Sequence, residues 1–139
     1  MSAKVFIDTN ILVYAHDIDA GKKHQTAHNL LYRLAQDRAA VLSMQVLQEF
    51  YVTVTRKLSS PLPKKVAREI VNDLAPWCVA TSPEEIKEAF RIEDQAKIGF
   101  WDALIVAAAI KAGASQIFSE DLNPGQRIAG VLVENPFAS

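Results

Sequence analysis

Short apolar runs alternate along this chain with longer stretches whose apolar positions repeat at helical spacing. Buried strands are predicted by the short runs, at residues 5–7, 40–42, 77–80, 117–119 and 131–133. Helices are predicted by the longer stretches, at residues 11–15, 24–36, 44–57, 64–74, 82–97 and 100–112. This alternation is typical of an α/β fold, so we expect a three-layer α/β/α sandwich around a short, mostly parallel five-stranded sheet.

The last predicted helix is the most apolar segment of the chain. Its residues are hydrophobic nearly all round, which predicts a helix packed on the sheet, with Trp101 in the core. Tyr51 lies in the apolar stripe of another helix and is also predicted to be buried. Either aromatic ring would have to be exposed to stack on a nucleic-acid base, as would those of Trp77 and Tyr32.

Composition favours one folded, intracellular domain. Half of the 139 residues are hydrophobic and 22% are charged, so we expect residues 1–139 to form a single domain. The longest apolar stretch, residues 103–110, is far too short to cross a bilayer, and no secretory signal is predicted. Cys78 is the only cysteine, which excludes an internal disulfide and fits a reducing compartment. We therefore expect a cytoplasmic protein with no membrane span.

Four acidic residues fall where an open parallel sheet places its ligand crevice, beyond the carboxyl ends of the strands. Asp8 directly follows the first predicted strand, and Asp121 lies two residues beyond the fourth. Asp102 begins the buried helix that leads into that fourth strand. Glu49 lies near the edge of an apolar helical stripe, so its side chain can lean over the sheet edge. These positions predict that the four carboxylates converge.

Carboxylates brought together repel one another, so such a cluster needs a cation or bound protons. Mg²⁺ or Mn²⁺ prefers oxygen ligands and keeps several waters, one of which can attack a phosphodiester. Thr9, Asn10 and Ser119 add neutral groups that can orient a carboxylate or a water. These residue types favour metal-dependent phosphodiester hydrolysis, with one or two metal ions left open.

Each acid also has a structural interpretation. Asp8 and Asp102 can cap helices, Asp121 can open a turn, and Glu49 can be a solvated helix residue. Taken singly, these interpretations hold at least as well as the functional one. They do not explain why three such residues would lie close to one glutamate in the middle of a helix. The prediction of a functional site therefore rests on the four acids together.

Net charge is −1, so bulk charge gives no indication of a nucleic-acid partner. With the four acids set aside, twelve acidic residues face fifteen basic ones outside the predicted pocket. Some of the basic residues form two groups that can contact phosphate or simply be solvated: Lys22, Lys23, Arg33 and Arg38, and then Arg56, Lys57, Lys64, Lys65 and Arg68.

Four segments carry a resemblance to a known family. Residues 8–12 (DTNIL) resemble the opening motif of the PIN-domain family, and residues 45–50 (QVLQEF) are similar to its second motif. Residues 101–108 (WDALIVAA) resemble the third motif and residues 119–122 (SEDL) the fourth. The motifs follow the family's order across nearly the whole chain, and the chain length most resembles that of VapC-type toxins.

This resemblance implies a Mg²⁺- or Mn²⁺-dependent endoribonuclease that acts on RNA. Asp8, Glu49, Asp102 and Asp121 are then the catalytic and metal-binding residues, with Thr9, Asn10 and Ser119 in support. A small antitoxin that blocks the acidic pocket and a homodimeric assembly are also implied. Ser119 stands where the family often has threonine, and Glu120 competes with Asp121 for the fourth acidic position.

Other functions compete with this one. A phosphorelay receiver needs an aspartate at the end of the third strand, and residues 77–81 contain none. A noncatalytic PIN-like module that binds RNA or protein stays open. His24 and His28 share a helix face and can hold zinc, but they lack the glutamate of the metalloprotease motif, so we interpret them as solvated. Asp17 and Asp19 do not fit a calcium loop.

Overall fold

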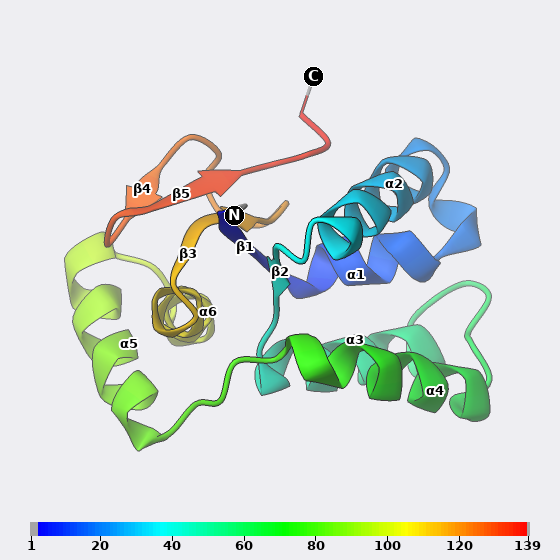
Figure 1. Cartoon of the computed structure of the whole chain (residues 1–139), viewed down its shortest axis with the longest axis horizontal. Helices are drawn as coiled ribbons and strands as arrows, with labels where there is room; N and C mark the ends of the chain where they lie inside the picture. Colours follow the sequence, from blue (N-terminus) through cyan, green and yellow to red (C-terminus); the bar gives the residue numbers. More distant parts are fainter. Residues whose placement is uncertain (1–2, 139) are drawn as a thin grey trace.

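The computed structural model describes residues 3–138, which form a five-stranded sheet surrounded by helices (Figure 1). The strands are β1 (Lys4–Ile7), β2 (Ala40–Val41), β3 (Ala114–Phe118), β4 (Arg127–Ile128) and β5 (Val131–Glu134). The α-helices are α1 (Thr9–His16), α2 (Lys22–Gln36), α3 (Met44–Arg56), α4 (Lys64–Leu74), α5 (Pro83–Ala96) and α6 (Phe100–Lys111). Two short 3₁₀ helices, η1 (Ile18–Ala20) and η2 (Ala75–Trp77), follow α1 and α4.

The strands are ordered β2-β1-β3-β5-β4, and only the β4–β5 pair is antiparallel. The chain leaves β1 toward β2 on one side and later returns to β3 on the other side. The neighbouring strands β1 and β3 therefore form the point where the connections diverge, and a ligand is expected beyond the carboxyl ends of such strands. This region, where Asp8 follows β1 and Asp121 lies shortly after β3, is called the crevice below. Ile7 pairs with Phe118 at that end, so the residues after both strands emerge side by side.

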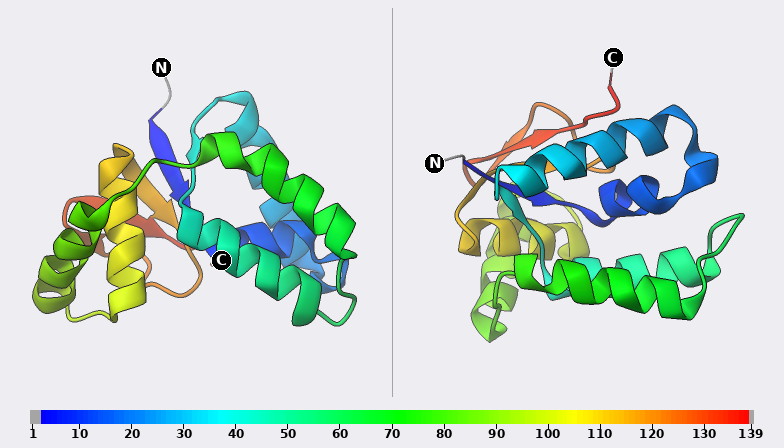
Figure 2. Two further views of the ribbon diagram at one scale, coloured as in Figure 1. Left: turned by 90° about the horizontal axis from the view of Figure 1, so that it is seen from below. Right: turned by 45° about the vertical axis from the view of Figure 1, so that its right-hand side comes forward.

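Right-handed crossovers explain where the helices lie. Because β1→β2 and β2→β3 run in opposite directions across the sheet, α1–α2 and α3–α6 belong to opposite faces. α1 packs against both α2 and α3, and α5 packs along α6, which contacts β3 and β5 (Figure 2). The predicted α/β/α architecture and the mostly parallel sheet are confirmed.

The core lies between the sheet and these helices. Its largest fully buried side chains include Phe6, Phe50 and Ile117. The start of α5 is fixed by a capping box, in which Ser82 accepts from the backbone and Glu85 accepts from the Ser82 N–H. Within residues 3–138, no helix is both long and apolar enough to cross a membrane.

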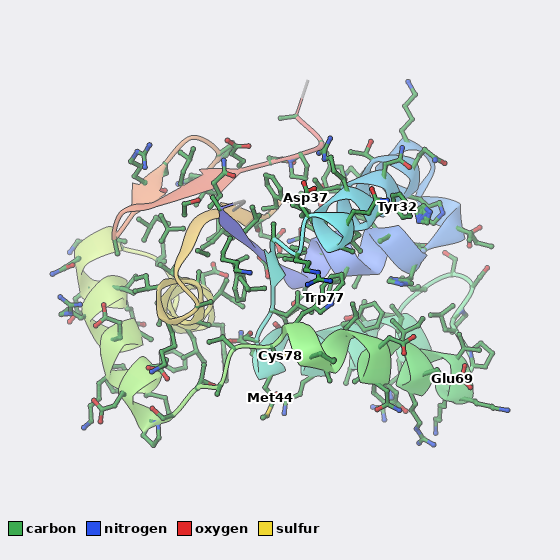
Figure 3. The ribbon with its side chains drawn as sticks, in the orientation of Figure 1. Tyr32, Asp37, Met44, Glu69, Trp77 and Cys78 are labelled. Carbon is green, nitrogen blue, oxygen red and sulfur yellow. The ribbon has the colours of Figure 1, made fainter. Side chains whose placement is uncertain are left out.

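One predicted strand is wrong. Residues 77–80 make only an isolated bridge, between Cys78 and Leu42, at the end of β2 (Figure 3). Pro76 lies in the short 3₁₀ helix η2 that follows α4, and Ser82 already caps α5. Only a few residues between them are therefore free to pair with the sheet edge. The apolar run packs beside β2 without extending the ladder.

The sheet instead gains β4, which the sequence pattern did not predict. Its two residues include one buried side chain, Ile128, too little for an apolar run. A two-residue turn joins β4 to β5, and both of its residues, Ala129 and Gly130, have positive φ angles of 50° and 88°. Such turns match the twist of a hairpin, which explains how so short a strand is held at the edge.

Candidate functional site

Asp8 lies at the centre of the crevice beyond β1 and β3. It follows β1 directly and caps α1, with its Oδ1 accepting from the Thr9 N–H at 2.7 Å. Its Oδ2 accepts from the Ser119 Oγ at 2.7 Å, and only 6% of the residue is exposed. Burial is the main cause that raises the pKa of Asp8, to about 6, although both hydrogen bonds lower it. The environment of Asp8 therefore disfavours its ionised form.

The segment after β3 is tied to Asp8 and to α1. Ser119 is fully buried, and its Oγ accepts from the Asp121 N–H at 3.1 Å while donating to Asp8. Asn10 donates from Nδ2 to the Asp121 Oδ2 at 3.1 Å and accepts at Oδ1 from the Glu120 N–H at 3.1 Å. Asn10 and Ser119 therefore orient the Asp121 carboxylate toward the crevice.

Glu120 has a different environment from its neighbour Asp121. Its Oε1 accepts from the Tyr14 hydroxyl at 2.7 Å, and its Oε2 forms an ion pair with the Lys23 ammonium. Burial by itself would raise the pKa of Glu120, but the hydrogen bonds from Lys23 and Tyr14 hold it below its ordinary value. Glu120 is thus engaged by α1 and α2, and this geometry favours Asp121 as the fourth acid of the cluster.

Glu49 and Asp102 approach from the helices of the other layer. The Glu49 Oε1 accepts from the Thr9 hydroxyl at 3.1 Å, which links α3 to the start of α1. Asp102 lies in the first turn of α6, where the helix dipole favours a negative charge. Burial, together with the charge of Asp121, raises the pKa of Asp102.

The four acids are electrostatic neighbours and lack basic partners. The charges of Asp121 and Glu49 both act to raise the pKa of Asp8. Among the ion pairs formed by residues 3–138, none includes Asp8, Glu49, Asp102 or Asp121. No three Asp, Glu, His or Cys side chains within that range are gathered closely enough to hold a metal ion as they stand. The carboxylates are close enough to influence one another's pKa, but they are not gathered into one group of ligands.

This donor set fits a hard dication. Its four charged groups are carboxylates that form no ion pair within residues 3–138, and hydrogen bonds hold the Asp8 and Asp121 side chains in place. Buried charge without a counter-charge is costly, so a dication would remove the largest unfavourable contribution at this site. Oxygen ligands select Mg²⁺ or Mn²⁺ rather than a metal that prefers thiolate or imidazole.

Two predictions about other side chains have different outcomes. Trp101, predicted to be in the core, is 66% exposed, whereas Ala103 in the same turn of α6 is fully buried, so this prediction is wrong. The helix is apolar on all sides, and Trp101 lies on the side that faces solvent. Tyr51 is partly buried against the core, and its hydroxyl accepts from the Arg68 Nε. The exposure of Trp101 could have been suspected from the sequence, because Trp101 directly precedes the candidate acid Asp102 at the start of a predicted helix.

The histidine pair has no third metal ligand within the part of the chain that the structure describes. The His24 and His28 rings stack with their centroids 6.0 Å apart. The His24 Nδ1 is paired with the Tyr14 carbonyl at 2.9 Å, so that nitrogen is occupied. The prediction of a solvated side chain therefore holds for His28, which is exposed, but not for His24, which is half-buried.

Comparisons with known proteins give a family and a fold. The sequence profile of the PIN domain matches residues 5–130. Solved structures with a similar fold include VapBC2 from Rickettsia felis bound to a promoter DNA fragment (23% identity, 94% of this chain and 97% of that chain, TM-score 0.65). They also include the Sarcin-Ricin loop cleaving toxin VapC20 from Mycobacterium tuberculosis (17% identity, 85% of this chain and 90% of that chain, TM-score 0.61). A third is DNA-bound VapBC from Salmonella typhimurium (16% identity, 97% of this chain and 99% of that chain, TM-score 0.66). A search of curated proteins finds no match.

Proposed function

The chain belongs to the PIN-domain family, and from that premise we propose that it is a metal-dependent endoribonuclease, the toxin of a VapBC-type toxin–antitoxin pair. In this proposal residues 1–139 act as one nuclease domain. The observation that carries it is the crevice beyond β1 and β3, where a buried Asp8 with a raised pKa lies near other acids and has no basic partner among residues 3–138. A cluster of this kind is unfavourable for the fold unless a cation binds there.

Asp8, Glu49, Asp102 and Asp121 are the proposed metal ligands and catalytic residues. Mg²⁺ or Mn²⁺ held by these residues would supply an activated water and would neutralise charge on the phosphodiester and its leaving group. The Thr9 N–H and the Ser119 hydroxyl hold both oxygens of Asp8, so this carboxylate presents a fixed orientation. Asn10 fixes Asp121 in the same way, and the Thr9 hydroxyl restrains Glu49. Such restraints reduce the reorganisation that metal binding requires.

RNA is the proposed substrate. The indole of Trp101 is exposed and belongs to the residue next to Asp102, whose Cα atom lies about 3.8 Å away along the chain. An exposed aromatic ring at that position can stack on an unpaired base while the neighbouring phosphate lies at the acids. VapC20, which shares the fold, is described as cleaving the Sarcin-Ricin loop.

The proposed partner is a small antitoxin, and the proposed assembly is a homodimer in the cytoplasm. The similar structures from Rickettsia felis and Salmonella typhimurium are VapBC assemblies, which supports a protein partner. An antitoxin that blocks the crevice would present basic side chains to it, because the four acids form no ion pair within residues 3–138. The single cysteine supports a reducing compartment.

A cleavage assay on a mixed RNA substrate tests the proposal. We expect cleavage with Mg²⁺ or Mn²⁺, none in excess chelator, and none by Asp8→Asn, whose circular dichroism should match that of the wild type. Cleavage that persists in chelator or in Asp8→Asn would overturn the assignment. An upstream reading frame for a small DNA-binding protein would support the toxin role.

A noncatalytic PIN-like module that binds RNA or protein is the second candidate. It is favoured by one observation, that the carboxylates within residues 3–138 are not gathered into a group able to hold a metal as they stand. Metal binding separates the two candidates. A folded protein that binds RNA but has no affinity for Mn²⁺ would support the module.

A further inference from the structure

Glu120 is the one acid of the segment after β3 that is matched by a basic residue. The Lys23 ammonium pairs with its Oε2, and the Tyr14 hydroxyl donates to its Oε1 at 2.7 Å. Lys23 comes from α2 and Tyr14 from α1, so one carboxylate joins two helices to the loop that follows β3. The pair links positions that are 97 residues apart, which distinguishes it from a local helix-surface pair.

The binding place for this carboxylate is itself braced. The Lys23 ammonium lies 5.0 Å from the centre of the Tyr14 ring and 5.6 Å from that of Phe137. The Tyr14 and Phe137 rings meet edge to face, with their centroids 5.1 Å apart. Two aromatic faces therefore restrict the lysine, so the ammonium is held in place for Glu120. The segment near the carboxyl end of the chain thereby contributes to the same contact.

A continuous set of hydrogen bonds leads from Glu120 to the acid cluster. The Glu120 N–H donates to the Asn10 Oδ1, and the Asn10 Nδ2 donates to the Asp121 Oδ2. The Asp121 side chain is exposed, and the nearby charges of Asp8 and Asp102 repel it. A loop that carries such a carboxylate needs an attachment outside the cluster, and the side chain of Glu120 provides one.

We propose that Glu120 is a positioning residue for the metal site: pairing with Lys23 and Tyr14 fixes the loop so that Asp121 faces the crevice, and keeps the Glu120 carboxylate out of it. The proposal rests on the metal-dependent function proposed above. It also assigns the roles of the two adjacent acids, with Asp121 as a ligand and Glu120 as its anchor. Outer groups of this kind commonly change metal affinity by about 10- to 100-fold when removed.

Mn²⁺ binding measured by isothermal titration calorimetry, without RNA, tests this role directly. We expect Glu120→Ala to weaken Mn²⁺ binding by about 10-fold or more, because the loop loses both contacts. Glu120→Gln should weaken it less, because its amide oxygen still accepts from Tyr14. Lys23→Met, at an exposed position, should also weaken binding, since it leaves Glu120 without a counter-charge and free to turn toward the crevice.

The Glu88–Arg91 pair supplies the matched control. The Glu88 and Glu120 side chains have similar exposure, 30% and 24%, and each pairs with a basic residue. Glu88 lies on α5 and pairs within one helical turn, so Glu88→Ala should leave Mn²⁺ affinity unchanged. Thermal unfolding in chelator checks that each variant is folded. If Glu120→Ala unfolds, Lys23→Met and Glu120→Gln carry the test.

The outcomes separate this inference from the function on which it rests. Mn²⁺ affinity within about twofold of the wild type in folded Glu120→Ala, Glu120→Gln and Lys23→Met overturns the positioning role. Loss of binding in Glu120→Gln together with retained binding in Asp121→Asn makes Glu120 the ligand, which also overturns it but leaves the function standing. A folded wild type without Mn²⁺ affinity, or an Asp8→Asn that binds equally well, overturns both proposals.

Discussion

The outer surface of α5 and the crevice beyond β1 and β3 both carry several acidic residues, but only those on α5 are paired with basic residues. On α5, Glu84 pairs with Lys87 and Glu88 with Arg91, each one turn away along the helix. At the crevice, Asp8 is buried beside other carboxylates and no basic side chain pairs with it within the described residues. Charges that serve only solubility can be balanced locally. An unbalanced buried carboxylate indicates a site kept for a ligand.

Glu120 and Asp121 show the same contrast between adjacent residues. Glu120 faces Lys23 and Tyr14, whereas Asp121 faces Asn10 and the repelling charges of the cluster. Two carboxylates that are neighbours in sequence therefore differ in their surroundings. Changes that remove an unbalanced carboxylate should alter function strongly, and changes to a balanced surface pair should alter little.

After the complete loss of cleavage expected for Asp8→Asn, the largest effect is expected for Asp102→Asn at the crevice. We expect RNA cleavage to fall on the order of 10²–10³-fold, as is typical when one charge-stabilising group is removed from an active site. Single-turnover cleavage at saturating Mn²⁺ measures this loss, with circular dichroism to check the fold. Glu84→Gln on α5 is the control, and equal activity in the two variants would remove the distinction between the regions.

A change in the pH dependence of stability is expected for Asp8→Asn. The folded-state pKa of Asp8, about 6, lies above its ordinary value of 3.8, so ionised Asp8 destabilises the fold. In the metal-free wild type, the loss of folding free energy caused by ionised Asp8 is small below pH 4. It grows between about pH 4 and 6 and reaches its full value above pH 6. It approaches about 3 kcal/mol. Urea unfolding in chelator should therefore show Asp8→Asn gaining stability relative to the wild type between pH 4 and 8. A difference that does not change with pH would contradict this account of the crevice.

Trp101→Ala should have the next largest effect. Losing one base-stacking contact costs about 1–3 kcal/mol, or roughly 5- to 150-fold in RNA affinity. Stability should change little, because the side chain is 66% exposed. Fluorescence anisotropy with a labelled single-stranded RNA and Asp8→Asn as the background measures binding without cleavage.

Tyr32→Ala is the control for that experiment, because Tyr32 is 64% exposed and lies on α2 (Figure 3). Its RNA affinity should equal that of the background protein. A weaker affinity in both variants, or in neither, would speak against Trp101 as the contact beside the acids.

The smallest effect is expected for Glu88→Ala at the balanced pair on α5. Exposed ion pairs contribute about 0–1 kcal/mol, so the free energy of unfolding should fall by no more than that. Cleavage should equal that of the wild type. Any substantial loss of cleavage would mean that α5 participates in the site.

Much of the fold could be predicted because periodicity records local burial. The apolar run of β1 and the helical stripes of α2 and α3 identified their elements, and the positions of Asp8 and Asp121 followed from strand ends. β4 could not be predicted, since it has a single buried residue and depends on the turn at Ala129 and Gly130. The apolar run around Trp101 concealed its exposure, because α6 is apolar on all sides and its sequence cannot tell which side faces solvent.

The competition between Glu120 and Asp121 could not be resolved from sequence for a related reason. The residue that engages Glu120 is Lys23, 97 positions earlier, and no local pattern connects them. In the sequence, Lys23 belongs to a basic group that can contact phosphate but is more simply interpreted as a solvated helix face. Only the tertiary arrangement of α1, α2 and the loop after β3 shows which carboxylate is balanced.

Calorimetric titration of the metal-free wild type with Mn²⁺, beside Asp8→Asn, tests the central claim that the acids of the crevice are kept for a cation. The account predicts saturable binding to the wild type and its loss in a folded Asp8→Asn. A folded wild type with no Mn²⁺ binding, or equal binding by both proteins, would contradict it.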